Sequence, residues 1–154
     1  GDGNLDVLIN TNDWSTEVLV GRYDALNGLL LKGDGKGGFT PKSIVESGIF
    51  IPGNGRAIAK LIGSENKYLV AASQNRGALK IYKLNVENEL IKLKPNDLYA
   101  EIEYFSGFKR KEEIYYGNSF LSQSSRFIKT DSKMKSVTIY NNVGEKRNVI
   151  TKTK

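Results

Sequence analysis

Short β-rich segments separated by glycine-, asparagine- and aspartate-containing turns run along almost the whole chain, and this pattern most strongly constrains the fold. Glycine and aspartate adopt left-handed backbone conformations at little cost, so the cluster at residues 33–38 (Gly-Asp-Gly-Lys-Gly-Gly) predicts a tight reversal. No segment before residue 85 combines a helical hydrophobic period with capping residues. The sequence therefore predicts an all-β protein with less than about 10% helix and more strand than the usual ~20–25%.

The expected strands can be placed by residue number. In the first part of the chain we expect strands at 5–9, 25–32, 43–51, 57–62, 68–73 and 78–84, with a turn at 52–55. In the second part we expect strands at 98–105, 109–116, 136–140 and 146–150. Alternation over 98–105 predicts one buried face made of Leu98, Ala100, Ile102 and Tyr104.

A weak internal repeat links two parts of the first half. Residues 5–12 resemble residues 67–75, and each is followed by a strand that begins with glycine, at 28–32 and at 77–83. The first copy carries about a dozen extra residues around Trp14 to Asp24. A spacing of roughly 50–60 residues with about four short strands per unit is typical of β-propeller blades.

The composition changes at the polar residues 85–89. We therefore expect propeller blades over 1–84, a linker over 85–96, a small antiparallel β domain over 97–150 and a tail over 151–154. Limited proteolysis should cut first between Leu84 and Asp97. Because the chain starts at Gly1 rather than at methionine, we expect it to be a piece of a longer protein.

Several kinds of chemistry are excluded by composition. The chain has no cysteine and no histidine, which removes disulfides, zinc–thiolate sites, cysteine nucleophiles and the Ser-His-Asp triad. Glu101 with Glu103, or Glu112 with Glu113, would be the carboxylate pair of a glycosidase. Alternation instead places Glu101 and Glu103 on the exposed face of one strand, so we expect no enzymatic activity.

The net charge of +6 raises the question of an acidic partner. The basic triplet at 109–111 is followed at once by Glu112 and Glu113, so a mixed-sign solvated surface explains it better than nucleic-acid binding. An acidic partner or a membrane surface is the alternative. No apolar run approaches the roughly 18 residues of a membrane span.

The first six residues, Gly-Asp-Gly-Asn-Leu-Asp, resemble the second half of an acidic calcium loop. Calcium takes about six to eight oxygen ligands, which alternate acidic side chains and a backbone carbonyl supply. On that pattern the ligands are Asp2, the carbonyl of Asn4 and Asp6, with two further acids upstream of residue 1. An Asp-Gly turn without metal is the structural alternative. We expect calcium in the complete protein and none in this fragment.

Together with the hairpin at 30–39 and the internal repeat, this loop makes residues 1–84 resemble FG-GAP/VCBS-repeat β-propellers. Residues 115–127 resemble the Gly-x-x-aromatic-Leu-Ser-Gln core of the ASPIC/UnbV C-terminal domain, which follows such repeats in that family. Residues 140–144 keep only the glycine of the family's Trp-Pro-Ser-Gly, and residues 126–128 depart from its His-Phe-Gly-Leu.

The resemblance implies a secreted or cell-surface, extracytoplasmic location. It implies a non-enzymatic binding or scaffolding module, the C-terminal part of a β-propeller protein, with a protein or a glycan at the cell surface as partner. The alternative is an accessory region of a larger cell-surface enzyme or polysaccharide-utilisation protein. The residues upstream of Gly1 would distinguish the two.

Two groups of residues are candidates for binding. Trp14 and Tyr23 lie in the insertion of the first repeat and would form an exposed aromatic platform, or else pack into a core. Ser122, Gln123 and Arg126 would display donors and acceptors on a recognition loop. The alternative for this loop is a structural turn, in which residues 120–121 anchor in the core while Ser122 and Gln123 satisfy backbone groups of the loop.

Overall fold

A computed structural model describes residues 3–85, 89–117 and 122–152 of the chain. It is all-β, with 48% strand and 5% helix, which confirms the expected fold class. The strands are β1 (Val7–Ile9), β2 (Leu29–Gly33), β3 (Phe39–Lys42), β4 (Asn54–Ile62), β5 (Tyr68–Asn75), β6 (Lys80–Lys83), β7 (Leu90–Lys92), β8 (Asp97–Tyr104), β9 (Lys109–Glu113), β10 (Phe127–Lys129), β11 (Met134–Asn141) and β12 (Lys146–Thr151). The helices are α1 (Ile44–Ser47) and the 3₁₀ turn η1 (Ser64–Asn66). Asp2, residues 86–88 of the expected linker, Phe120, Leu121 and residues 153–154 of the expected tail lie outside the described residues.

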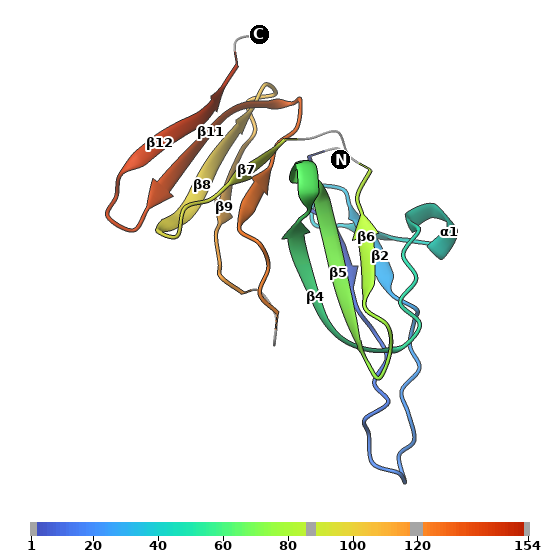
Figure 1. Cartoon of the computed structure of the whole chain (residues 1–154). Coiled ribbons are helices and arrows are strands. Elements are labelled where there is room, and N and C mark those ends of the chain that lie inside the picture. Colours follow the sequence, from blue (N-terminus) through green and yellow to red (C-terminus); the bar gives the residue numbers. More distant parts are fainter. Residues whose placement is uncertain (1–2, 86–88, 118–121, 153–154) are drawn as a thin grey trace.

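The first half consists of two antiparallel three-stranded sheets, β1-β2-β3 and β4-β5-β6 (Figure 1). They meet around a small core whose central side chain, Ile51, has no exposed surface. Side chains from both sheets and from the segment between them form this core: Leu8, Ile49, Ile51, Ile58, Ala72 and Tyr82.

Each copy of the internal repeat forms two neighbouring antiparallel strands. The first copy gives β1 and β2, and the second gives β5 and β6. The copies occupy different places in their sheets, because the first is followed by β3 whereas the second is preceded by β4. The edge of β5 that β4 covers therefore corresponds to an outer edge of β1.

The second half contains a four-stranded antiparallel sheet in the order β12-β11-β8-β9 and a two-stranded ladder of β7 with β10. Ile91 of β7 and the neighbouring Leu93 pack against the buried side chains of the larger sheet. The stretch 85–96 that was expected to be a linker thus contains a strand. Both β7 and β10 have only three residues, too few to show an alternating pattern.

The segment 43–51, expected to be β-rich, instead contains helix α1, so this prediction was wrong. The Ser43 side chain accepts a hydrogen bond from the Glu46 backbone N–H, and the Glu46 carboxylate accepts one from the Ser43 N–H. This is a capping box, which satisfies N–H groups that the first helical turn leaves free. Gly48 ends the helix with a φ of +68°.

The alternation expected along β8 holds for Ala100, Ile102 and Tyr104, which are buried, but fails at its start. Leu98 is 49% exposed and Asp97 is fully buried. The pairing of β8 with β11 shifts register between Tyr140 and Asn141, opposite this point. An irregularity of this kind changes which side chain faces the core, and the period-two pattern cannot show it.

The two halves contact each other along the free edge of β4. The Ser125 N–H donates to the Lys60 carbonyl at 2.7 Å, and the Lys60 N–H donates to the Ser124 hydroxyl at 2.9 Å. The Tyr68 and Phe127 rings pack edge to face with centroids 4.9 Å apart. Burial, with a smaller effect of the Glu112 charge, raises the pKa of Tyr68 to about 12.

Among the described residues, no helix has the length and apolar character needed to cross a membrane.

Candidate functional site

The insertion between β1 and β2 forms a long loop that projects from the first half of the molecule (Figure 1). At its tip the side chains of Val18 and Leu19 are each 98% exposed, and Val20 is 54% exposed. The Val20 and Gly21 N–H groups donate to the Glu17 carbonyl at 3.0 and 3.2 Å. The tip is thus a hydrogen-bonded turn that presents three aliphatic side chains to solvent.

Behind the tip, polar and aromatic contacts brace the loop. Asp13 and Tyr23 exchange two backbone hydrogen bonds, at 3.0 and 2.7 Å. The Trp14 indole N–H donates to the Asp24 carboxylate at 2.7 Å, and the Arg22 Nε donates to the same carboxylate at 2.6 Å. The Arg22 guanidinium lies 5.0 Å from the centre of the Trp14 ring, a cation–π contact. The two arms of the loop are therefore joined through side chains as well as backbone.

The base of the loop is fixed to the segment that leads into β4. The Asn12 amide donates to the Pro52 and Gly53 carbonyls, both at 3.3 Å. The Asn54 amide donates to the Ser15 hydroxyl at 3.1 Å. These contacts join residues about 40 positions apart, so the loop is held by the body of the first half.

Trp14 and Tyr23 therefore lie on this loop, 39% and 59% exposed, and neither belongs to a core cluster. Trp14 is engaged by Asp24 and Arg22, so its ring helps to brace the loop. The sequence interpretation overlooked Val18 and Leu19. The signal was present, because residues 18–20 (Val-Leu-Val) are consecutive apolar residues inside a polar insertion.

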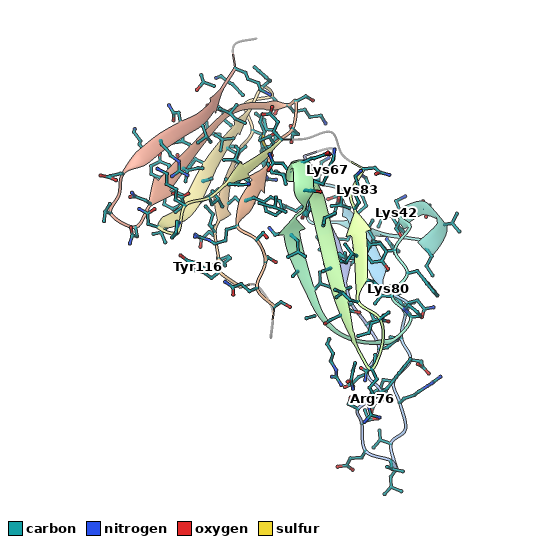
Figure 2. All side chains as sticks on the ribbon, in the orientation of Figure 1. Lys42, Lys67, Arg76, Lys80, Lys83 and Tyr116 are labelled. Atoms are coloured by element: carbon teal, nitrogen blue, oxygen red, sulfur yellow. The ribbon has the colours of Figure 1, made fainter. Side chains whose placement is uncertain are left out.

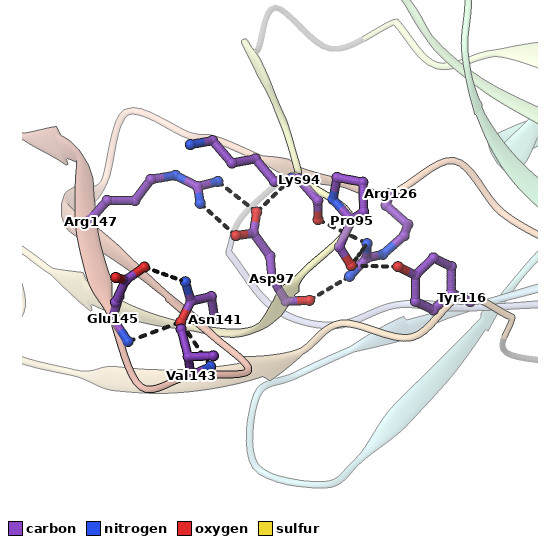
Figure 3. A network of polar contacts seen from close by, with 9 residues as sticks. All are labelled: Lys94, Pro95, Asp97, Tyr116, Arg126, Asn141, Val143, Glu145 and Arg147. Atoms are coloured by element: carbon purple, nitrogen blue, oxygen red, sulfur yellow. Dashed lines mark hydrogen bonds and ion pairs between the residues drawn. The ribbon is translucent and has the colours of Figure 1, made fainter.

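Arg126 is used inside the second half (Figure 3). Its guanidinium donates to the Lys94 and Pro95 carbonyls at 2.9 Å each and to the Asp97 carbonyl at 2.5 Å. It also lies 4.1 Å from the centre of the Tyr116 ring. These contacts tie Arg126 to the turn before β8.

The other two candidate residues of the recognition loop, Ser122 and Gln123, differ in exposure. Ser122 is buried, with 8% of its surface exposed, whereas Gln123 is exposed. Residues 120–121, which were expected to anchor the loop, lie outside the described part of the chain. The structure thus does not bring Ser122, Gln123 and Arg126 together on one exposed surface.

Asp97 is the most enclosed charge among the described residues. It is fully buried and forms a two-point ion pair with Arg147, at 2.5 and 2.6 Å, and accepts the Lys94 N–H at 2.7 Å. Burial alone would raise the pKa of Asp97, but the Arg147 and Lys94 donors outweigh it and hold the pKa below its usual range. Its hydrogen-bond partners are the backbone N–H of Lys94 and the side chain of Arg147 on a neighbouring part of the fold, which indicates that Asp97 stabilises the folded domain.

Two of the candidate calcium residues, Asn4 and Asp6, contact the end of β2 through their side chains. The Asp6 carboxylate accepts the Gly33 N–H at 3.0 Å, and the Asn4 amide donates to the Gly33 carbonyl at 3.3 Å. Asp2 is outside the described residues. Within 3–85, 89–117 and 122–152 no group of three or more acidic, histidine or cysteine side chains fits a metal ion. The calcium site therefore stays a prediction for the complete loop.

A hollow of about 160 Å³ lies between the glycine-rich turn at 33–38 and the β8–β9 hairpin. Phe39 and Phe108, 50% and 59% exposed, contribute to its lining together with the polar side chains of Asn4 and Arg110. Exposed rings beside hydrogen-bonding groups suit a small amphipathic ligand such as a sugar.

Four carboxylates considered for glycosidase chemistry each have a partner on the sheet surface. Glu101 accepts the Tyr140 hydroxyl, and three glutamates form ion pairs at 2.8–3.1 Å: Glu103 with Lys135, Glu112 with Arg110, and Glu113 with Lys111.

Comparisons with protein-family models, curated proteins and solved structures found no match to this chain. Proposals about its function therefore depend on its residue pattern and geometry.

Proposed function

We propose that this chain is a non-enzymatic extracytoplasmic binding or scaffolding module, the C-terminal part of a β-propeller protein of the FG-GAP/VCBS type. The two three-stranded antiparallel sheets that pack against each other would be successive blades, and the second half would be an ASPIC/UnbV-like domain. The repeat supports this, because equivalent residues form neighbouring antiparallel strands in both sheets. The extracytoplasmic location follows from the resemblance alone.

One observation carries the proposal: the outer face of the first sheet is apolar and open. Leu8 faces the core that the two sheets share, so Val7 and Ile9 face away, and each is 37% exposed. Leu31 pairs with Val7 and Leu29 with Ile9, which places all four on the same face, where Leu29 and Leu31 are partly exposed. An open apolar face of this kind marks an interaction surface.

The occupant that fits this face is another sheet of the same propeller. The second sheet already covers the inner face of the first, and blades in a propeller repeat that packing around an axis. The internal repeat adds a second reason, since an outer edge of β1 corresponds to the edge of β5 on which β4 lies. We therefore propose that a preceding blade covers the outer face and that a strand equivalent to β4 pairs with β1.

The test uses the 154-residue chain and the apolar dye 1-anilinonaphthalene-8-sulfonate. The chain should bind the dye and self-associate as its concentration rises, and Val7→Lys or Ile9→Lys should reduce both. Val143→Lys is the matched control, because Val143 is 70% exposed on the turn between β11 and β12. A monomeric chain that binds no dye, or equal effects of all three variants, would contradict the proposal.

The absence of enzymatic activity remains part of the proposal. It is supported by the surface ion pairs and hydrogen bonds that engage Glu101, Glu103, Glu112 and Glu113. A protein or glycan partner would meet the hollow beside Phe39 and Phe108, where aromatic side chains project beside the polar side chains of Asn4 and Arg110.

A further inference from the structure

From its tip to its base, the projecting loop presents first aliphatic, then aromatic and then arginine side chains. Neither the packing of the two sheets nor the core requires this arrangement. Its tip consists of Val18, Leu19 and Val20, aliphatic side chains on a convex turn. Glu17, next to them, is an exposed carboxylate at the same end. Folding gains nothing from two side chains that remain 98% exposed, and contiguous apolar side chains on a projecting turn suit a contact outside the chain.

The next layer back from the tip is aromatic. Trp14 and Tyr23 stand on opposite arms of the loop, at or beside the backbone pairing of Asp13 with Tyr23. Both rings are partly exposed, and each carries a polar atom. Tryptophan and tyrosine concentrate at the boundary between hydrocarbon and water, because their rings are apolar and their N–H or O–H groups are not.

The layer behind the aromatic residues carries arginines. Arg56 donates to the Ser15 hydroxyl and lies 3.9 Å from the Asp13 carboxylate, at the base of the loop. Arg76 is exposed on the turn after β5, beside the pairing of Asn75 with Asn54 (Figure 2). Arg22 lies over the Trp14 ring and so belongs to the aromatic layer, where it pairs with the Asp24 carboxylate at 2.6 Å.

We propose that this loop inserts its tip into the surface of a lipid bilayer. The three layers match the boundary of a bilayer in order. The aliphatic tip would meet acyl chains, the aromatic rings would lie at the interface, and the arginines would lie beside the phosphates, which compete with Asp24 for Arg22 and with Asp13 for Arg56. The net charge of +6 draws the whole chain toward an anionic surface. The braced loop loses little conformational freedom on contact, since its arms are already joined.

A groove on a partner protein is the competing occupant, and Glu17 distinguishes the two. A carboxylate beside an inserting tip opposes entry into lipid, so Glu17→Gln should strengthen lipid binding. In a protein groove an exposed carboxylate at the rim would pair with a cation, and the same variant would weaken that contact. The lipid contact does not require the two sheets to be propeller blades.

The experiment measures co-sedimentation of the 154-residue chain with vesicles of phosphatidylcholine and phosphatidylglycerol at a 3:1 ratio. Trp14 is the sole tryptophan of the chain, so its emission reports on the loop. Binding should shift that emission to shorter wavelength as water leaves the ring. Absence of co-sedimentation by the unmodified chain at low salt overturns the proposal.

The decisive variant is Val18→Ser with Leu19→Ser, which should weaken vesicle binding about tenfold or more, because burying one aliphatic side chain is worth about a factor of ten or more. Both positions are almost fully exposed, so the fold should be unaffected, as far-UV circular dichroism will check. Val45→Ser is the matched control, since Val45 is 95% exposed on α1. Equal binding by the double variant and the unmodified chain, or weaker binding by Glu17→Gln, overturns the proposal.

Discussion

Asp97 and Arg147 show how a single ion pair allows a charge inside a small β domain. A buried carboxylate is costly unless it is paired and hydrogen-bonded, and Asp97 has the two terminal guanidinium nitrogens of Arg147 and the Lys94 N–H within 2.7 Å. The pair joins the first residue of β8 to β12, two strands that are not neighbours in the sheet. Removing one partner therefore leaves the other uncompensated.

We expect Arg147→Met to lower the free energy of unfolding by about 3 kcal/mol, because it strands the Asp97 carboxylate in the interior. Urea unfolding followed by circular dichroism measures the change. Lys146→Met, which removes an exposed cation from the preceding position of β12, should change stability by less than about 0.5 kcal/mol. Similar losses of unfolding free energy in the two variants would show that the Asp97–Arg147 ion pair makes no specific contribution to stability.

Asp97 also predicts a pH dependence. Its pKa is lowered in the folded protein, so the unfolded chain binds the proton more readily and the stabilisation is complete above the unfolded value of about 3.9. It should be lost as the pH falls through the lower folded value. The stability difference between the unmodified chain and Asp97→Asn, measured by urea unfolding, should therefore be largest above pH ~5 and shrink toward pH ~2. A difference that grows on acidification would refute this sign.

At the scale of the elements, the four-residue helix α1 depends on contacts at its two ends. Such a short helix has no stability of its own, so its end contacts decide whether it forms. The Lys42 ammonium and the Ser43 groups lower the pKa of Glu46 to about 2, which keeps that carboxylate charged and bonded to the cap over the physiological range. Gly48 closes the other end.

We expect Ser43→Ala to speed amide hydrogen exchange at Glu46 about fivefold, which corresponds to about 1 kcal/mol for a lost N-cap. The Glu46 N–H loses its side-chain acceptor in this variant. Ser47→Ala is the control. It removes the hydrogen bond from the Ser47 hydroxyl to the Ser43 carbonyl but leaves the Ser43–Glu46 cap intact. Unchanged exchange at Glu46 in Ser43→Ala would mean that tertiary contacts hold the segment without the cap.

At the scale of the whole molecule, Phe127 joins the two halves. Its side chain is 96% removed from solvent, packs against Tyr68 of β5 and has the Lys60 ammonium 5.5 Å from its ring centre. The neighbouring Ser125 accepts the Ile62 N–H and donates to Lys60. The segment before β10 thus lies along β4 in place of a fourth strand.

Phe127→Ala should lower the free energy of unfolding by about 3–4 kcal/mol. It should also speed hydrogen exchange at the Lys60 and Ile62 amides, which lie in the other half. Phe108→Ala is the control, since Phe108 is 59% exposed at the β8–β9 turn. If exchange rose in β10 and stayed constant at Lys60 and Ile62, the two halves would be energetically independent.

Patterns that depend on neighbouring residues were readable from the sequence. Gly- and Asp-rich turns located the hairpin of β2 with β3, and alternation identified Ala100, Ile102 and Tyr104 as buried. The sequence also contained a signal for helix α1, because Ser43 and Glu46 have the spacing of a capping box. The β-rich composition of residues 43–51 led to the prediction of a strand instead. The candidate site was predicted in part: Trp14 and Tyr23 are on the exposed loop, while the more exposed Val18 and Leu19 were overlooked.

The sequence by itself determined the all-β class and most strand positions, because turn residues and two-residue periodicity act over a few positions. Only the tertiary structure decided that Asp97 is buried while Leu98 is exposed, that Arg126 holds a turn, and that β7 pairs with β10. These features depend on contacts between residues about 30 to 50 positions apart, such as Asp97 with Arg147 and Lys92 with Phe127. Local preference carries no information about such partners, because the free energy of the contact arises only when the chain brings them together.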